Sequence, residues 1–139
     1  MSTRRHKIVL ANGCFDQLHY GHLIHLEAAK AMGAFLVVSI TKDEKVNKGP
    51  GRPVYPEEHR AALVGALKCV DEVIIVDGLL TALTLICPDI LVKGIDYAKG
   101  LEPVHERFCK DMGIQIRFTD TPKLTARELI DESRRRSGL

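Results

Sequence analysis

The sequence predicts an α/β domain built on a parallel five-stranded sheet, and three observations carry this prediction. Short apolar segments rich in β-branched residues alternate along the chain with segments of helical spacing, which is typical of βαβ units. Runs such as FLVVSI and VIIV lack the polar alternation of a half-exposed strand and so indicate strands covered on both faces. A chain of 139 residues with 45% hydrophobic residues can bury one substantial core. We therefore expect a single domain.

The strands are expected at five short segments, most of them β-branched. In chain order they are Ile8–Leu10, Phe35–Ile40, Val73–Val76, Ile90–Val92 and Ile114–Phe118. A segment with helical spacing separates each strand from the next, and crossovers between parallel strands are right-handed. These rules favour a Rossmann-like three-layer sandwich with the strands in the order 3-2-1-4-5.

The helices are expected between the strands, at Gly21–Met32, Pro56–Leu67, Leu79–Ile86, Glu102–Met112 and from Thr125 onward. Gly33 follows the first of them and is suited to a C-terminal cap. Pro56 and the two acidic residues after it suit a first helical turn, where a missing N–H is harmless and the helix dipole favours negative charge. Thr125 has the hydroxyl of an N-cap residue.

Charge and targeting patterns argue against several classes of protein. The chain has 20 Lys and Arg against 18 Asp and Glu, a net charge of +2, which does not indicate binding of nucleic acid through bulk charge. The basic run at 134–136 is expected to be a solvated helix end. The apolar run Ile8–Ala11 is far shorter than a signal-peptide core, and no segment approaches the roughly 20 apolar residues of a membrane helix. We therefore expect a cytoplasmic protein with no nucleic-acid or membrane partner.

The cysteines do not form a recognisable functional pattern. They are widely separated and include no C-x-x-C pair: Cys14, Cys69, Cys87 and Cys109. This spacing indicates neither a zinc cluster nor a redox dithiol. We expect the four residues to act as small hydrophobic side chains in a reducing compartment.

Three polar segments follow predicted strands and are the places where a site is expected. They are NGCFDQLHYGH (12–22), TKDEKVNKGPGRPVY (41–55) and GIDYAKGLEP (94–103). The second is longer than most connections in α/β proteins and too polar to pack. Because ligands of open parallel sheets bind outside the carboxyl ends of the strands, we expect these three segments to surround one site.

The first of these segments has the composition of an anion site. Gly13 and Gly21 allow the backbone to approach a ligand, and the start of a helix offers free N–H groups and a positive dipole end. His19 and His22 are three residues apart, so both imidazoles can point to one side of the helix start and add donors. Two alternatives stay open: a metal site that also uses His25, since imidazoles at this spacing can share a metal, and histidines without a role.

The same segment carries a family resemblance. GCFDQLHYGH resembles the G-x-F-D-x-x-H-x-G-H signature of the cytidylyltransferase-like nucleotidyltransferases. KGPGRPV, PEEHRAALVGALKCVDEVII and PDILVKGIDY are similar to the adenylyltransferase domain that activates heptose 1-phosphate for lipopolysaccharide precursors. VDEV and the K-G-x-D-Y element are also similar to glycerol-3-phosphate cytidylyltransferase. These elements extend from Ile8 to Tyr97, so the resemblance implies that residues 1–139 are a single nucleotidyltransferase domain.

The resemblance implies transfer of a nucleotidyl group from ATP or CTP to a phosphorylated sugar or polyol, with release of pyrophosphate. The acceptor phosphate is already ionised at neutral pH, so no side chain is needed as a general base. Catalysis then consists of positioning and charge neutralisation. Mg²⁺ is expected to arrive with the triphosphate, without dedicated protein ligands. Relatives of this kind are often dimers, so a homodimer is possible.

The resemblance also implies roles for individual residues of the first two segments. His19 and His22 would contact the triphosphate and stabilise charge at the reacting phosphorus. Asp16 would sit by the phosphates or order the loop, and Phe15 would pack or line the pocket. Lys48 would close over the substrates as an electrostatic clamp.

Other positions matched by the resemblance carry weaker roles or alternatives. Lys93, Gly94 and Asp96 lie where the family contacts nucleotide, with Asp96 suited to ribose hydroxyls. Lys45 is a second candidate for the clamp, although a solvated loop lysine is the alternative. Arg60 is either a nucleotide contact or only a charge on the helix surface.

The chain departs from the family pattern at two places. Lys68 stands where the family has an arginine before the V-D element, which removes a bidentate fork. KLTARELI replaces the hydroxyl-rich S-T-T element that opens the last helix, so Thr125 is either a phosphate contact or a simple N-cap, and Arg127 could replace lost phosphate contacts. A heptose 1-phosphate adenylyltransferase is therefore the leading hypothesis. The alternatives are an alkyl-phosphate cytidylyltransferase and an inactive nucleotide-binding module.

Overall fold

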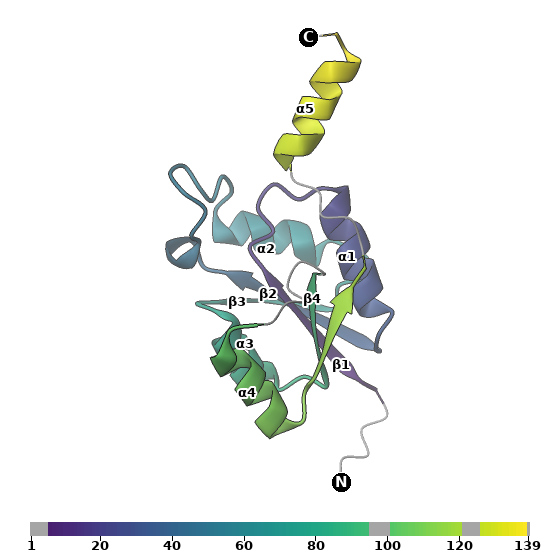
Figure 1. Cartoon of the computed structure of the whole chain (residues 1–139), viewed down its shortest axis with the longest axis vertical. Coiled ribbons are helices and arrows are strands. Elements are labelled where there is room, and N and C mark those ends of the chain that lie inside the picture. The colour runs from purple at the N-terminus through teal and green to yellow at the C-terminus, as the bar shows by residue number, and fades with distance from the viewer. Residues whose placement is uncertain (1–5, 95–100, 121–125, 139) are drawn as a thin grey trace.

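The computed structural model describes residues 6–94, 101–120 and 126–138, and these form the predicted parallel sheet with helices on both faces (Figure 1). The strands are β1 (Ile8–Gly13), β2 (Phe35–Thr41), β3 (Glu72–Val76), β4 (Ile90–Gly94) and β5 (Gln115–Thr119). All neighbouring pairs are parallel, and the order is β3-β2-β1-β4-β5. This confirms the predicted order 3-2-1-4-5.

In the part of the chain that the structure describes, four helices connect successive strands and pack on the faces of the sheet, and a fifth helix follows the last strand. They are α1 (Tyr20–Lys30), α2 (Glu57–Gly65), α3 (Leu79–Ile86), α4 (Pro103–Met112) and α5 (Ala126–Arg136), with a short 3₁₀ turn at Asp43–Lys45. Helices α1 and α2 cover one face, and α3 and α4 cover the other (Figure 1). The last helix, α5, stands apart from these three layers, and its side chains from 127 to 136 are exposed.

The core consists of two apolar layers separated by the sheet. Alternate residues of a strand point to opposite faces, so Val9 and Ala11 pack under α1 and α2, whereas Leu10 packs under α3 and α4. Strands β1 and β4 lie inside the sheet and are almost fully buried on both sides. Strand β2 also lies inside the sheet, and its residues from Leu36 to Ile40 are buried. The prediction of a strand covered on both faces is thus confirmed for FLVVSI except at Phe35, which is exposed where β2 begins.

That prediction is wrong in part for VIIV. Strand β3 is at the edge of the sheet, and Ile75 in its middle is 36% exposed. The apolar run gives no sign of this, because a strand's position in the sheet depends on which strands pair with it. Ile75 pairs with Ile40 of β2, and no strand lies on the outer side of β3 within the sheet that the described residues form.

The expected helix ends are correct at Gly113 and wrong at Gly33. Gly113 adopts a left-handed conformation with φ of 71° and caps α4. Helix α1 instead ends at Lys30, with Ala31 as a right-handed cap residue. Gly33 is needed for space: a Cβ there would lie 2.7 Å from Val9 Cγ2 and 2.8 Å from the Lys7 carbonyl oxygen.

Strand β1 extends to Gly13, beyond the predicted end at Leu10, and both ends of α2 differ from the expectation. Pro56 is the N-cap residue of α2 and so precedes the first turn in which it was expected. The helix also ends at Gly65, before the predicted end at Leu67. The proposed N-cap at Thr125 lies outside the described residues.

We predict that Gly33→Ala destabilises the domain by about 1–3 kcal/mol, because the backbone carbonyl of Lys7 cannot move aside without disturbing β1. Gly65→Ala is the matched control. A Cβ at Gly65 would make an ordinary contact of 3.5 Å with Val73, so this variant is expected to keep or slightly raise stability. The free energy of unfolding measured with urea distinguishes the two, and equal values for both variants would contradict the steric argument.

Candidate active site

The loop between β1 and α1 lies at the carboxyl edge of the sheet and is held in an unusual conformation. Phe15 and Gln17 both have positive φ, 53° and 52°, a region that costs non-glycine residues energy and is often found at functional sites. Phe15 is buried, and a Cβ at Gly13 would lie only 2.8 Å from its ring. Gly13 therefore makes room for the Phe15 ring, a different role from the close approach to a ligand that the sequence suggested.

His19 and His22 form a reciprocal cap at the start of α1. The Gly21 N–H donates to His19 Nδ1 at 3.0 Å, and the His19 N–H donates to His22 Nδ1 at 3.1 Å. An imidazole nitrogen that accepts a hydrogen bond carries no proton, so each neutral ring carries its proton on Nε2. The cap thus fixes one tautomer in both residues and leaves Nε2–H as the donor of each ring.

This arrangement corrects one expectation about the helix start. The N–H groups of Gly21, His22 and Leu23 are already engaged with His19, through its ring or its carbonyl oxygen. They are therefore not free to hold an anion, although the helix dipole still favours negative charge here. Gly21 is itself buried. Donation to an anion at this junction falls to the imidazoles.

The two rings are held by stacking as well as by the cap. Their centroids are 4.0 Å apart with 26° between the planes. Phe15 packs edge-on against His22 with a centroid distance of 5.4 Å, an arrangement favoured by the ring quadrupoles. Phe15 thus packs against the site, as the resemblance implied, and orients one of the histidines.

His22 is neutral at pH 7 in this structure. Burial lowers its pKa from 6.5 to about 4, and the positive charges of His19, Lys48 and His25 act in the same direction, with Asp16 opposing them. His22 is therefore uncharged before substrate binds. His22 acts there as a neutral donor.

The two candidate lysines of the second segment lie in different surroundings. Lys48 is exposed, and its charge acts on His22. Lys45, on the 3₁₀ turn, acts instead on Asp77, at the end of β3. The charge of Lys48 thus acts at His22 and that of Lys45 at Asp77, which is consistent with the alternative of a solvated lysine for Lys45.

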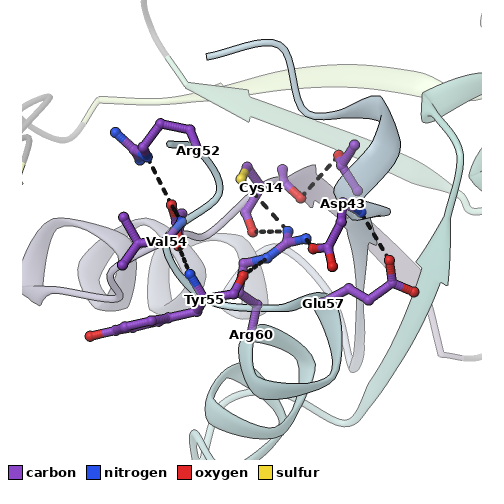
Figure 2. A network of polar contacts seen from close by, with 10 residues as sticks. Cys14, Asp43, Arg52, Val54, Tyr55, Glu57 and Arg60 are labelled. Carbon is purple, nitrogen blue, oxygen red and sulfur yellow. Dashed lines mark hydrogen bonds and ion pairs between the residues drawn. The ribbon is translucent and has the colours of Figure 1, made fainter. Parts of the chain in front are cut away.

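Asp16 orders the loop that follows β2. Its carboxylate accepts hydrogen bonds from the Val54 N–H at 2.7 Å, the Tyr55 N–H at 2.9 Å and Arg52 Nε at 2.9 Å (Figure 2). Burial alone would raise the pKa of Asp16, but these three donors outweigh it and keep the pKa below 3.8. Of the two expected roles, the structure shows loop ordering.

Arg60 is buried, so its interpretation as a helix-surface charge is wrong. Its side chain is fully inaccessible to solvent and hydrogen-bonds to Cys14, Asp43 and Tyr55 (Figure 2). Two features of this helix could have indicated that Arg60 is buried and has polar partners. Arg60 precedes the buried Val64 by one helical turn, and a cation in the first turn of a helix opposes the dipole unless it has a partner.

The third segment is described only in part. Lys93 and Gly94 end β4, beside β1 in the sheet, and Lys93 is 8% exposed. A lysine so deeply buried near the carboxyl edge is consistent with the expected nucleotide contact. Asp96 lies outside the described residues, as does Thr125.

His25, the third histidine of the metal-site alternative, contacts a threonine of β5. His25 Nδ1 lies 2.7 Å from Thr119 Oγ1, so the ring connects α1 to the end of β5. Over the ranges 6–94, 101–120 and 126–138, no group of three His, Cys, Asp or Glu side chains is arranged to hold a metal ion. Over the same ranges, no helix is long and apolar enough to cross a membrane.

A family model described as cytidylyltransferase-like matches residues 10–134. The chain belongs to the cytidylyltransferase-like family. The junction built from Gly13, Phe15, Asp16, His19 and His22 carries the motif that resembles the family signature, so we take it as the candidate active site.

Individual relatives and a solved structure are similar to this chain over most of its length. The chain is 42% identical over 115 residues to the bifunctional protein HldE of Helicobacter pylori (strain HPAG1) and 44% identical over 119 residues to that of Methylococcus capsulatus. These matches cover 80% and 82% of the chain, but the chain spans only about a quarter of the length of these relatives. The lipopolysaccharide core biosynthesis protein from Thermoplasma volcanium has a similar structure, with a TM-score of 0.73 and 30% identity, over 85% of this chain and 99% of that one.

We predict that His22 makes this family member sensitive to mild acid. The unfolded chain protonates this ring near pH 6.5 and the folded chain only near pH 4, so folding loses up to about 3 kcal/mol as the pH falls between these values. In His22→Asn, an amide oxygen can replace Nδ1 as the acceptor but does not titrate. The variant should lose less stability than the wild type over this interval, measured by urea unfolding.

The control for this measurement is His59→Asn, at an exposed position on α2. It should follow the wild-type dependence. Asp16 and Asp71, whose pKa values are lowered, change stability at lower pH and do not mask the effect. Equal pH dependence in His22→Asn and the wild type would show that His22 is not held neutral.

Proposed function

We propose that this domain transfers a nucleotidyl group from a nucleoside triphosphate to a sugar phosphate, with ATP and heptose 1-phosphate as the substrates. The observation that carries the chemistry is the His19–His22 cap, which fixes two Nε2–H donors at the carboxyl edge of the sheet, with the charge of Lys48 nearby. The similarity to the bifunctional protein HldE and to a lipopolysaccharide core biosynthesis protein supports this choice of acceptor.

The reaction needs positioning more than proton transfer. A phosphate oxygen of the acceptor attacks the α-phosphorus and forms the new P–O bond, while the bond between the α-phosphorus and the bridging oxygen breaks and its electron pair leaves with pyrophosphate. The acceptor oxygen is already ionised, so no base is required. Negative charge grows on the equatorial and leaving oxygens, where donors fixed in advance lower the barrier without reorganisation.

The neutral state of His22 suits this task. An uncharged ring costs less to bury than an imidazolium, so the empty site is stable at pH 7. A triphosphate placed beside the ring would raise its pKa, since a nearby negative charge favours the protonated form. Substrate binding would thus increase the positive charge of the site where the transition state needs it.

Mg²⁺ fits this site as a companion of the triphosphate. Both oxygens of Asp16 are occupied by donors from the 52–55 segment, so this carboxylate is not offered to a metal. Magnesium is commonly held by substrate phosphates and water, with few protein ligands. When bound, it would neutralise charge on the leaving pyrophosphate. The side chains of the chain supply the donors on the transferred phosphate.

One experiment distinguishes the proposed substrates from the other substrates that the family resemblance suggests. Purified protein with Mg²⁺ is assayed for pyrophosphate release with ATP or CTP and a panel of sugar and polyol phosphates. Activity with CTP and glycerol 3-phosphate would favour the cytidylyltransferase. Binding of a nucleotide with no product from any acceptor would identify a binding module. Sugar and polyol phosphates are soluble in water, so the proposed substrates are compatible with a cytoplasmic enzyme. The proposed chemistry would be the same in a monomer and in a homodimer.

We predict that His19→Asn lowers turnover by roughly 100-fold or more, because the Asn oxygen can replace Nδ1 in the cap but the variant lacks the Nε2–H donor. Its thermal unfolding midpoint should stay close to that of the wild type, unlike that of His19→Ala, which also loses the cap. His59→Asn is again the matched control, with unchanged pyrophosphate release. Near-normal turnover of His19→Asn would remove His19 from the mechanism.

A further inference from the structure

We propose that Arg60 is a positioning residue for the transfer reaction: it fixes both ends of the 43–55 segment to the β1–α1 loop, and so sets the position of Lys48 relative to that loop. The proposal rests on the proposed function. It adds a residue that contacts neither substrate, and it explains how an exposed lysine acquires a defined position.

The guanidinium of Arg60 joins the β1–α1 loop to both ends of the 43–55 segment. Nη1 donates to the Cys14 carbonyl oxygen at 2.9 Å, Nε to the Tyr55 carbonyl oxygen at 2.9 Å, and Nη2 to Asp43 Oδ1 at 2.6 Å. Figure 2 shows these bonds fanning out from one side chain. Cys14 belongs to the loop that carries Phe15 and Asp16, so Arg60 connects that loop to both ends of the 43–55 segment.

Other side chains reinforce the same two ends. Glu57 of α2 accepts a hydrogen bond from the Asp43 N–H at 2.9 Å. Asp16 accepts hydrogen bonds from Val54 and Tyr55 at the other end. The residues from Asn47 to Gly51 between these ends are exposed, and a Cβ at Gly49 or Gly51 would meet nothing within 4 Å. The tip of the segment does not pack against the domain, so the position of Lys48 depends on the two anchored ends.

The choice of arginine is informative because a buried cation is costly. Removing a guanidinium from water carries a large desolvation penalty, and an apolar side chain could fill the same space without it. Only a planar group with several donors can hold two carbonyl oxygens and a carboxylate at fixed angles. Among the charged residues that the structure describes, Arg60 is the most deeply buried, with no surface exposed to solvent. The geometry that Arg60 imposes fixes the ends of the segment that carries Lys48 relative to the loop that precedes His22.

The test is a double-mutant cycle between Asp43 and Lys48. Asp43→Asn weakens the ion pair at a side chain that is 41% exposed, so the variant is expected to fold. If Arg60 acts by placing Lys48, Asp43→Asn and Lys48→Ala each lower kcat by about 10-fold or more with little change in KM, and the double variant is no worse than Lys48→Ala alone. Lys45→Ala, whose charge acts on Asp77, should leave kcat unchanged. Multiplying losses in the double variant would overturn the proposal.

A second readout does not depend on activity. Because the Lys48 charge lowers the pKa of His22, Lys48→Ala should raise that pKa, measured by NMR titration of the ring protons. Asp43→Asn should raise it too, and the double variant should show no further rise. An unchanged pKa in Asp43→Asn, beside a raised one in Lys48→Ala, would contradict the proposal even if no acceptor substrate were found.

Substitution of Arg60 itself completes the set. Arg60→Lys keeps the charge but cannot hold three acceptors, so it should resemble Asp43→Asn in both readouts if it folds. An inactive wild type with the expected His22 titrations would reject the proposed function and keep the positioning role. An active wild type in which Asp43→Asn and Lys48→Ala have independent effects would keep the proposed function and reject the positioning role.

Discussion

Parallel pairing of the five strands is the constraint on which the rest of this structure depends. Because every strand runs in the same direction, every segment that follows a strand leaves from the same edge of the sheet. The β1–α1 loop, the 43–55 segment and the end of β4 are thus brought to one edge. The apolar layers on both faces, buried by the helix pairs α1–α2 and α3–α4, hold the strands in this register.

At that edge, polar contacts replace apolar packing. The cap formed by His19 and His22 fixes the orientation and tautomer of the rings, and the Phe15 ring supports His22 from the side. Beneath them, Asp16 and Arg60 satisfy the backbone of two irregular segments. Buried polar groups of this kind stabilise only when their partners are all present. No buried side-chain nitrogen or oxygen in the described residues lacks a partner.

Burial and most of the nearby charges act in the same direction on His22. Burial favours a neutral His22, and the nearby cations strengthen this preference. In the empty site His22 is therefore uncharged. The Nε2–H groups of His19 and His22 are still donors that a phosphate could accept from. An anion-binding site that stays neutral until its ligand arrives avoids much of the cost of a buried charge.

The sequence by itself determined the strand order and the family, and it indicated where a candidate site lies, because hydrophobic period, crossover handedness and the H-x-G-H spacing are local or topological signals. It also gave both possible roles of Asp16. Only the tertiary structure decided what depends on contacts between distant segments. Edge exposure at Ile75, steric crowding at Gly33, the neutral state of His22 and the burial of Arg60 all belong to this second group. Each depends on which atoms surround a residue in space, and the residue's own pattern in the chain carries little of that information.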